Sequence, residues 1–335
     1  TMNLPEMLQS LLAQPALQQG LALQIETQKA FYQRAKVIAG AECPVSLPAE
    51  DMFSVERNFF STFFLAVTAC ITKDPSRLPL YAMVNQGMRA WVTACDNILD
   101  DEYKEIFCFT FPGEGMRVRS VLTLLLADRV VTEFIAETYG DLAMITEVGK
   151  SSLQSLIPCA LQECEEEIRP VSVLPPEEIL RDIHKRKTAD LFVAPLALPL
   201  AMETVDPAIA DAAVAAVRRF GQACQIIDDL KDMPGDVCEG RHNLLVSIVA
   251  QENDDEYWLD HLRAIDEWDW ASWERYPAAA RSAAQMAMGE FQGSFEALAT
   301  IGISLSSSQR DAVISCIFTL LKVPMTLIQR PDEGH

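Results

Sequence analysis

Basic residues are few in this sequence. Lysine and arginine together number 27 of the 335 residues, against 48 aspartates and glutamates, so the formal net charge is −21. Proteins that bind nucleic acid neutralise phosphates with lysine and arginine, and this balance argues against such a role. The same charge would repel an anionic substrate unless metal ions lay between the two. Clustered carboxylates are therefore the first feature to look for.

The sequence also lacks the patterns that mark secreted and membrane proteins. Its nine cysteines include no C-x-x-C pair and are scattered through apolar segments, which indicates reduced thiols in a reducing compartment. The N-terminal segment has neither the basic nor the continuous apolar region of a signal peptide, and no uncharged apolar run reaches the roughly 18 residues of a membrane span. We expect a cytoplasmic protein without a transmembrane segment.

Glycine is scarce as well, at 14 residues, while helix-forming residues dominate and the hydrophobic segments run far beyond strand length. The fold class is therefore expected to be all-α. Half of the residues are hydrophobic and no long linker interrupts the chain, so we expect residues 1–335 to form a single domain. Proline and glycine divide the pattern into helical segments predicted near 4–38, 50–73, 78–102, 116–138, 142–168, 176–203, 207–233, 254–266, 276–299 and 307–328.

Two groups of carboxylates stand at the ends of strongly apolar segments. Asp96 and Asp100 are four residues apart and share one helix face, next to Asp101. Acidic side chains at a helix C-terminus oppose the macrodipole and repel each other, by about 0.3–1 kcal/mol each. Two such groups favour a clamp for magnesium and diphosphate over a solvated surface, because Mg²⁺ takes carboxylate and phosphate oxygens. The second group consists of Asp228, Asp229 and Asp232.

The segments around these carboxylates resemble the motifs of trans-prenyl diphosphate synthases. GQACQIIDDLKD is similar to the second aspartate-rich motif of that family, and HKRKTADLF to its Lys-Thr element, which contacts the diphosphate. DNILDD resembles the first aspartate-rich motif, with Asn97 in place of the second aspartate, and EGRHNLL takes the place of a late basic segment. Outside the first motif, the matching positions are Lys187, Thr188, Gly221, Gln225, Asp228, Asp229, Asp232 and Arg241.

The resemblance covers roughly residues 80–250 and identifies the chain as similar to the isoprenoid synthase superfamily. It implies a helical bundle around a deep central apolar cavity, a prenyl diphosphate substrate and Mg²⁺, in a cluster of three ions. It also implies a homodimer.

Two departures from the family guide the predicted reaction. Chain-elongating members carry a Gly-Lys-Arg cluster on an early helix and an Arg-Arg-Gly after the first motif, and together these bind isopentenyl diphosphate. Both are absent here. Arg57 is the one cation of the early helix SVERNFFSTFFLAV, and the segment that follows the first motif, EYKEIFCFTFPGEG, contains no arginine. A second diphosphate needs its own cationic pocket. The sequence therefore predicts a terpene synthase, a lyase that ionises farnesyl or geranylgeranyl diphosphate and cyclises the cation.

Each candidate residue has a role under this hypothesis. The predicted metal ligands are Asp96, Asp100, Asp101, Asp228, Asp229 and Asp232. The predicted catalytic residues are Asp96, Asp100, Asp228 and Lys187, which stabilise the leaving diphosphate. The predicted substrate-binding residues are Lys187, Thr188, Gln225, Arg241, Arg117, Lys231, Trp91 and Phe192, with Trp91, five residues before the first motif, favouring a short farnesyl chain.

Two alternatives stay open. One is a trans-prenyl diphosphate synthase that binds isopentenyl diphosphate through other residues, and the other is a non-catalytic regulatory subunit of such a synthase. The histidines show no metal-ligand spacing and are assigned no chemistry. The run from Glu163 to Glu167 is predicted to be a solvated helix face.

Overall fold

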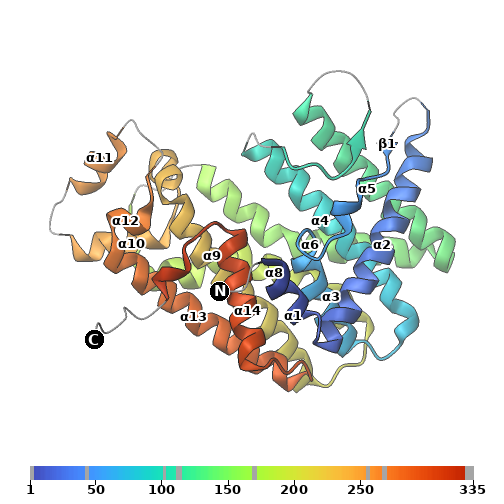
Figure 1. Cartoon of the computed structure of the whole chain (residues 1–335). Coiled ribbons are helices and arrows are strands. Elements are labelled where there is room, and N and C mark those ends of the chain that lie inside the picture. The colour runs from blue at the N-terminus through green and yellow to red at the C-terminus, as the bar shows by residue number, and fades with distance from the viewer. Residues whose placement is uncertain are drawn as a thin grey trace. The chain divides into compact units, whose positions relative to one another are not determined.

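The computed structural model describes residues 4–41, 45–100, 103–110, 115–167, 172–253, 257–265 and 270–328, and these are mostly helical (Figure 1). The all-α fold class is confirmed. Strand structure in these ranges is limited to β1 (Val45–Ser46) and β2 (Cys108–Phe109), which pair antiparallel. The chain divides into two compact units, an N-terminal unit (residues 12–154 and 195–210) and a C-terminal unit (residues 1–11, 155–194 and 211–335). The single domain over residues 1–335 stays a prediction.

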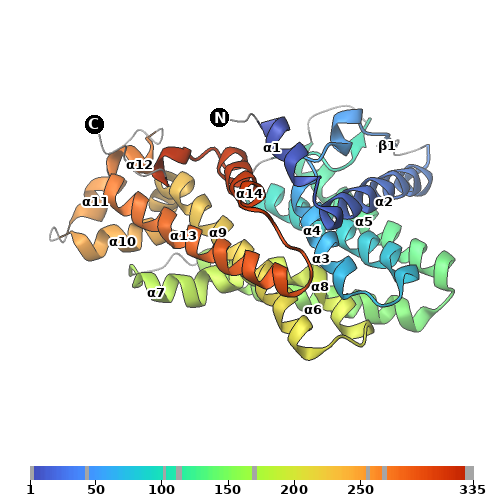
Figure 2. The same ribbon diagram turned by 60° about the horizontal axis from the view of Figure 1, so that its bottom comes forward.

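The N-terminal unit is built from long helices that pack closely in sequence order. Helix α2 lies against α3, and α4 lies against both α2 and α5 (Figure 2). A side chain at Gly20 on α2 would clash with the backbone carbonyl of Thr62, so glycine allows these helices to approach closely. The elements of this unit are α2 (Pro15–Ala39), η1 (Glu50–Phe53), α3 (Phe59–Ile71), η2 (Pro75–Arg77), α4 (Leu78–Leu99) and α5 (Met116–Tyr139).

Three helices have residues in both units, namely α6 (Leu142–Glu167), α8 (Asp190–Met202) and α9 (Pro207–Glu239). In the C-terminal unit, α9 packs along α13, where the rings of Phe220 and Phe291 meet with centroids 5.4 Å apart and Ser294 donates to the carbonyl of Ala216 at 2.8 Å. The other elements of this unit are α1 (Leu4–Leu11), α7 (Pro176–Glu178), the π-helix η3 (Ile179–Ala189), α10 (Leu244–Glu252), α11 (Trp258–Arg263), α12 (Ser272–Arg275), α13 (Pro277–Thr300), α14 (Ser307–Leu320) and η4 (Met325–Leu327).

The predicted end of α9 is wrong, because the helix continues through Pro234 to Glu239. Proline has no backbone N–H, so it leaves the carbonyl four residues earlier without its helical donor. Here that carbonyl, of Leu230, accepts a hydrogen bond from the Ser272 hydroxyl instead. Helix α10 was not predicted at all. It begins at Asn243, whose side-chain oxygen accepts from the N–H groups of Leu245 (2.9 Å) and Val246 (3.2 Å).

No helix in the described part of the chain is both long enough and apolar enough to cross a membrane. The cytoplasmic location stays a prediction.

Candidate active site

Three aspartates follow one face of α9 in the C-terminal unit. Asp228, Asp232 and Asp236 are spaced four residues apart, so their carboxylates lie in a row. Burial, with the negative charge of Asp232, raises the pKa of Asp228 to about 7. Burial, with the charge of Asp229, raises the pKa of Asp236 to about 8. The protein alone therefore stabilises the ionised form of these carboxyls poorly. Asp236 escaped the sequence analysis, although its spacing from Asp232 was the available signal.

Asp229, between them in sequence, is buried and fully engaged by protein groups. Its Oδ2 lies 2.8 Å from Nε2 of His184 and accepts the N–H of Leu244 at 2.6 Å, and its Oδ1 accepts Nε2 of Gln225 at 2.8 Å. Burial alone would raise the pKa of Asp229, but the charge and hydrogen bond of His184 lower it. Its role as a metal ligand stays a prediction. The contacts favour a structural role at the junction of three helices.

Lys187 and Thr188 lie near the end of the π-helix η3. In that helix the backbone bonds span five residues, as in the N–H of Asp190 donating to the carbonyl of Lys185. π-Helical segments are rare and are frequently found at functional sites. Thr188 donates from its hydroxyl to Oε1 of Gln225, so the Lys-Thr element is tied to α9. The sequence pattern of this segment gave no sign of the π geometry.

Lys187 is surrounded by carboxylates. Burial alone would lower the pKa of its ammonium, but the charges of Asp236, Glu163, Asp229 and Glu166 outweigh burial and raise it. The side chain therefore stays charged and is placed beside the aspartate row. That is the arrangement needed to share a diphosphate with metal ions held by the same row.

The predicted solvated face on α6 is wrong for Glu166, whose side chain is buried, with 4% of the residue exposed. Its carboxylate accepts the N–H of His242 at 3.0 Å and the amide of Gln162 at 3.1 Å. Glu165 matches the prediction, since it is exposed and pairs with Arg186 at 3.2 Å. Adjacent residues of one acidic run thus face opposite environments, and composition alone cannot tell them apart.

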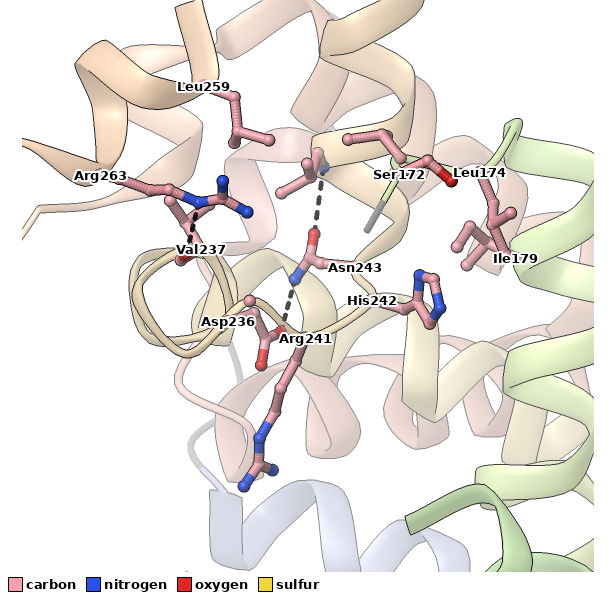
Figure 3. A pocket seen from close by; sticks show the side chains of 13 residues that line it. Ser172, Leu174, Ile179, Asp236, Val237, Arg241, His242, Asn243, Leu259 and Arg263 are labelled. Atoms are coloured by element: carbon pink, nitrogen blue, oxygen red, sulfur yellow. Dashed lines mark hydrogen bonds between the residues drawn. The ribbon is translucent and has the colours of Figure 1, made fainter. Parts of the chain in front are cut away.

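A small pocket of about 80 Å³ is lined in part by Asp236, Arg241 and His242 (Figure 3). Asn243 stands between Asp236 and the start of α10, because its amide donates to Oδ2 of Asp236 at 2.8 Å while its oxygen caps the helix. Arg241 forms an ion pair with Glu239 at 2.7 Å and donates its backbone N–H to the carbonyl of Asp236. The predicted late basic segment is therefore next to the aspartate row.

The first motif lies at the end of α4, in the N-terminal unit. The backbone carbonyl of Asp96 accepts the N–H of Asp100 at 2.8 Å, which closes the last turn. Asn97 is buried, and its side chain binds the backbone of Lys104. Its amide donates to the carbonyl of Lys104 at 3.0 Å, and its oxygen accepts the N–H of Lys104 at 2.8 Å. Asn97 thus shapes the segment after the motif rather than the motif itself. Asp101 lies outside the described residues.

The remaining predicted residues have these positions. Arg117 is exposed near the start of α5, and Lys231 is exposed and pairs with Asp232 at 3.1 Å. The ring of Trp91 lies beside Gly87 on α4. Phe192 packs against Gly221, where an added Cβ would come within 2.7 Å of its ring, so the glycine of the motif makes room for Phe192. The two aspartate motifs belong to different units, and their convergence stays a prediction.

A second cationic position was missed in the N-terminal unit. Arg89, on α4, donates to the carbonyl of Arg57 at 2.9 Å and to Oδ1 of Asn58 at 2.7 Å. Burial and the nearby charge of Arg57 lower the pKa of Arg89. The guanidinium of Arg57 also forms an ion pair with Asp51 at 3.3 Å, so an anion bound at this position would chiefly stabilise the charge of Arg89. Arg89 precedes Asp96 by seven residues, two helical turns, and that spacing was the available signal.

Among the described residues, no three histidine, cysteine, aspartate or glutamate side chains form a ready-made metal site. Mg²⁺ does not require one, since it is commonly held by one or two carboxylates together with substrate phosphates. The raised pKa of Asp228 shows that its charged form lacks compensation, which a divalent cation would supply. The residues present therefore fit Mg²⁺.

Comparison with known proteins supports the resemblance to prenyl diphosphate synthases that the sequence motifs indicate. Residues 159–241 match the polyprenyl synthetase family model. Over nearly its whole length the structure matches solved prenyl synthases. The chain has the isoprenoid synthase fold. One neighbour is a decaprenyl diphosphate synthase from Rhodobacter capsulatus, with 16% identity, a TM-score of 0.57, and coverage of 91% of this chain and 98% of the other.

Two further neighbours extend the comparison. A geranylgeranyl pyrophosphate synthetase from Pyrococcus horikoshii is 19% identical, with a TM-score of 0.55 and coverage of 94% of this chain and 99% of the other. A polyprenyl synthase from Caulobacter crescentus was solved with calcium and isoprenyl diphosphate. It is 14% identical, with a TM-score of 0.61 and coverage of 94% of this chain and 97% of the other. No curated protein matches the sequence. The predicted resemblance to the isoprenoid synthase superfamily is confirmed.

The predicted terpene synthase activity is wrong. The family model and the three neighbours above describe prenyl diphosphate synthases, which are transferases rather than lyases. The prediction rested on a missing cationic pocket, and it considered only the two sequence segments that supply that pocket in relatives. Arg89 lies in neither segment, yet α4 brings it beside Arg57.

Proposed function

We propose that this chain is a trans-prenyl diphosphate synthase, which joins an allylic prenyl diphosphate to isopentenyl diphosphate. The position of Arg89, near enough to Arg57 for that charge to lower its pKa, is the observation that carries this proposal, because it supplies a cationic position separate from the Lys187 region. Two diphosphates need two such positions, since neither can stay unpaired beside clustered carboxylates. The match of residues 159–241 to polyprenyl synthetases supports the same reaction.

In this reaction the C1–O bond of the allylic diphosphate breaks, and the bonding electrons leave with the diphosphate. The double bond of isopentenyl diphosphate attacks C1 and forms a new C–C bond, and loss of a proton restores a double bond in the lengthened chain. Lys187 and Thr188 would bind the leaving diphosphate, and Lys187 would stabilise the charge that builds on it. Arg57 and Arg89 would hold isopentenyl diphosphate in place for attack.

Mg²⁺ is the proposed cofactor, in a cluster of three ions by resemblance. When bound, it would neutralise charge on the leaving diphosphate. Asp228 and Asp232 in the C-terminal unit, with Asp96 and Asp100 in the N-terminal unit, would hold it. The aspartates therefore have to be ionised in the working enzyme.

A homodimer is also proposed. On α5, Val118, Val121 and Leu125 are exposed by 59%, 46% and 64%, and their spacing places them on one helix face. An exposed apolar face of this kind is typical of a surface that a partner covers. Sedimentation of the purified chain, with Leu125→Glu as the comparison, tests this.

The activity is tested by incubating the protein with Mg²⁺, labelled isopentenyl diphosphate and, in separate reactions, geranyl, farnesyl and geranylgeranyl diphosphate. A labelled diphosphate longer than the allylic substrate supports the proposal. A hydrocarbon or alcohol formed from the allylic substrate alone would refute it. Complete inactivity with all three substrates would instead favour a regulatory subunit, for which the replacement of an aspartate by Asn97 in the first motif is the supporting feature.

A further inference from the structure

His184 is a buried side chain that the proposed reaction does not use. It is 1% exposed and lies in the π-helix η3, three residues before Lys187. Its Nε2 is 2.8 Å from Oδ2 of Asp229, a carboxylate that is itself 3% exposed. Because the carboxylate can only accept, Nε2 carries the hydrogen and donates it. Gln222 lies on the other side of the ring, with its amide 3.5 Å from Nδ1.

The same carboxylate connects η3 to α9 a second time. Oδ1 of Asp229 accepts the amide of Gln225, and Oε1 of Gln225 accepts the hydroxyl of Thr188. His184 and Thr188 flank Lys187 in sequence, so the segment that carries Lys187 is fixed to one aspartate from both sides. A buried charge with several hydrogen bonds holds its partners in a defined geometry, whereas a buried charge that loses a donor is strongly unfavourable.

Asp229 also joins the start of α10 to this arrangement. Its Oδ2 accepts the N–H of Leu244, and its backbone carbonyl accepts the amide of Asn243, which donates to Asp236 as well. One carboxylate therefore fixes η3, α9 and α10 together. The hydrogen bonds named above involve neither Asp228 nor Asp232, the other two aspartates of the motif.

We infer that His184 is a positioning residue, which holds Lys187 and Thr188 against the α9 aspartates through Asp229 so that one diphosphate can contact both. This inference rests on the proposed function for the identity of the site, namely that the site binds a diphosphate with Mg²⁺. It does not depend on whether the bound substrate is then elongated. His184 itself touches neither the diphosphate nor the metal.

The test compares two polar replacements in the full-length chain. In His184→Gln the side-chain amide reaches about as far as Nε2 of histidine and restores the donor to Asp229, whereas in His184→Asn the amide falls short. Binding of inorganic pyrophosphate in the presence of Mg²⁺ is measured by titration calorimetry, and folding is checked by circular dichroism. Ser294→Ala is the matched control, because it removes a buried hydrogen bond to the same helix, at Ala216, away from the aspartates.

We expect His184→Gln to bind pyrophosphate within about threefold of the unaltered protein and His184→Asn to bind on the order of 10-fold more weakly or worse. Ser294→Ala should lower stability without changing the affinity. Equal affinities for the two His184 variants would overturn the inference, as would a loss in Ser294→Ala as large as that in His184→Asn. If the unaltered protein binds pyrophosphate but elongates no substrate, the proposed function fails while this inference stands.

Discussion

The raised pKa of Asp228 leads to a prediction about the metal-free protein. The pKa of this carboxyl rises from 3.8 to about 7 because of burial and the neighbouring charge of Asp232. The folded state therefore holds the proton more tightly than the unfolded chain does. Ionisation of Asp228 costs stability, beginning near pH 4 and reaching its full value above about pH 7. At about 1.4 kcal/mol per pKa unit, the full cost is about 4 kcal/mol.

Asp228→Asn removes this cost, because the amide has a similar shape and no charge. At pH 8 without metal, we expect the variant to be more stable than the unaltered protein by about 1–3 kcal/mol, less than the full cost because Lys231 loses a counter-charge. At pH 5 the gain should shrink by about 2 kcal/mol, because Asp228 is then mostly protonated in the folded protein. Urea unfolding at pH 5 and pH 8 measures both differences.

A matched control is Asp211→Asn, an exposed position on the same helix, which should change stability by less than about 0.5 kcal/mol at either pH. Adding Mg²⁺ and pyrophosphate should stabilise the unaltered protein, by about 2.7 kcal/mol at 100 times the dissociation constant, and should stabilise Asp228→Asn much less. The reasoning is refuted if Asp228→Asn is less stable than the unaltered protein at pH 8, or if the difference does not change with pH.

Three further substitutions test the rest of the site. Arg89→Met should raise the KM for isopentenyl diphosphate by about 10-fold to 100-fold in steady-state assays while the allylic KM changes little, and an equal rise in both would contradict the assignment. Asp96→Ala should leave the circular dichroism spectrum intact and lower kcat by on the order of 100-fold or more, whereas a normal rate would remove Asp96 from the site. Asn97→Asp should not raise kcat and should destabilise the protein to urea by about 1–3 kcal/mol, because a carboxylate oxygen would face the carbonyl of Lys104; a higher kcat would contradict this reasoning.

The sequence was sufficient for the fold class and for the motif positions. Apolar periodicity extends over most helices, and the Asp228 and Lys187 segments keep their family spacing, so both could be recognised without coordinates. The continuation of α9 past Pro234 could not be recognised, because the donor that replaces the missing N–H, Ser272, is distant in sequence.

Roles within the site were harder to predict than its location. Asp228 and Asp229 are identical in type and adjacent, yet one carries a raised pKa and the other is held ionised by His184. That difference depends on which side of α9 each faces and on what η3 brings there. The same limit explains the wrong reaction, since the position of Arg89 beside the backbone of Arg57 becomes visible only in the folded chain.

The π-helix that carries Lys187 makes the number of residues in this segment important. Each residue of a helix turns the chain by a fixed angle, so deleting one residue between His184 and Lys187 would move the lysine to another side of the helix relative to the histidine. The ammonium group would then no longer face the aspartates of α9. Chains related to this one should therefore tolerate substitutions in this segment better than changes in its length.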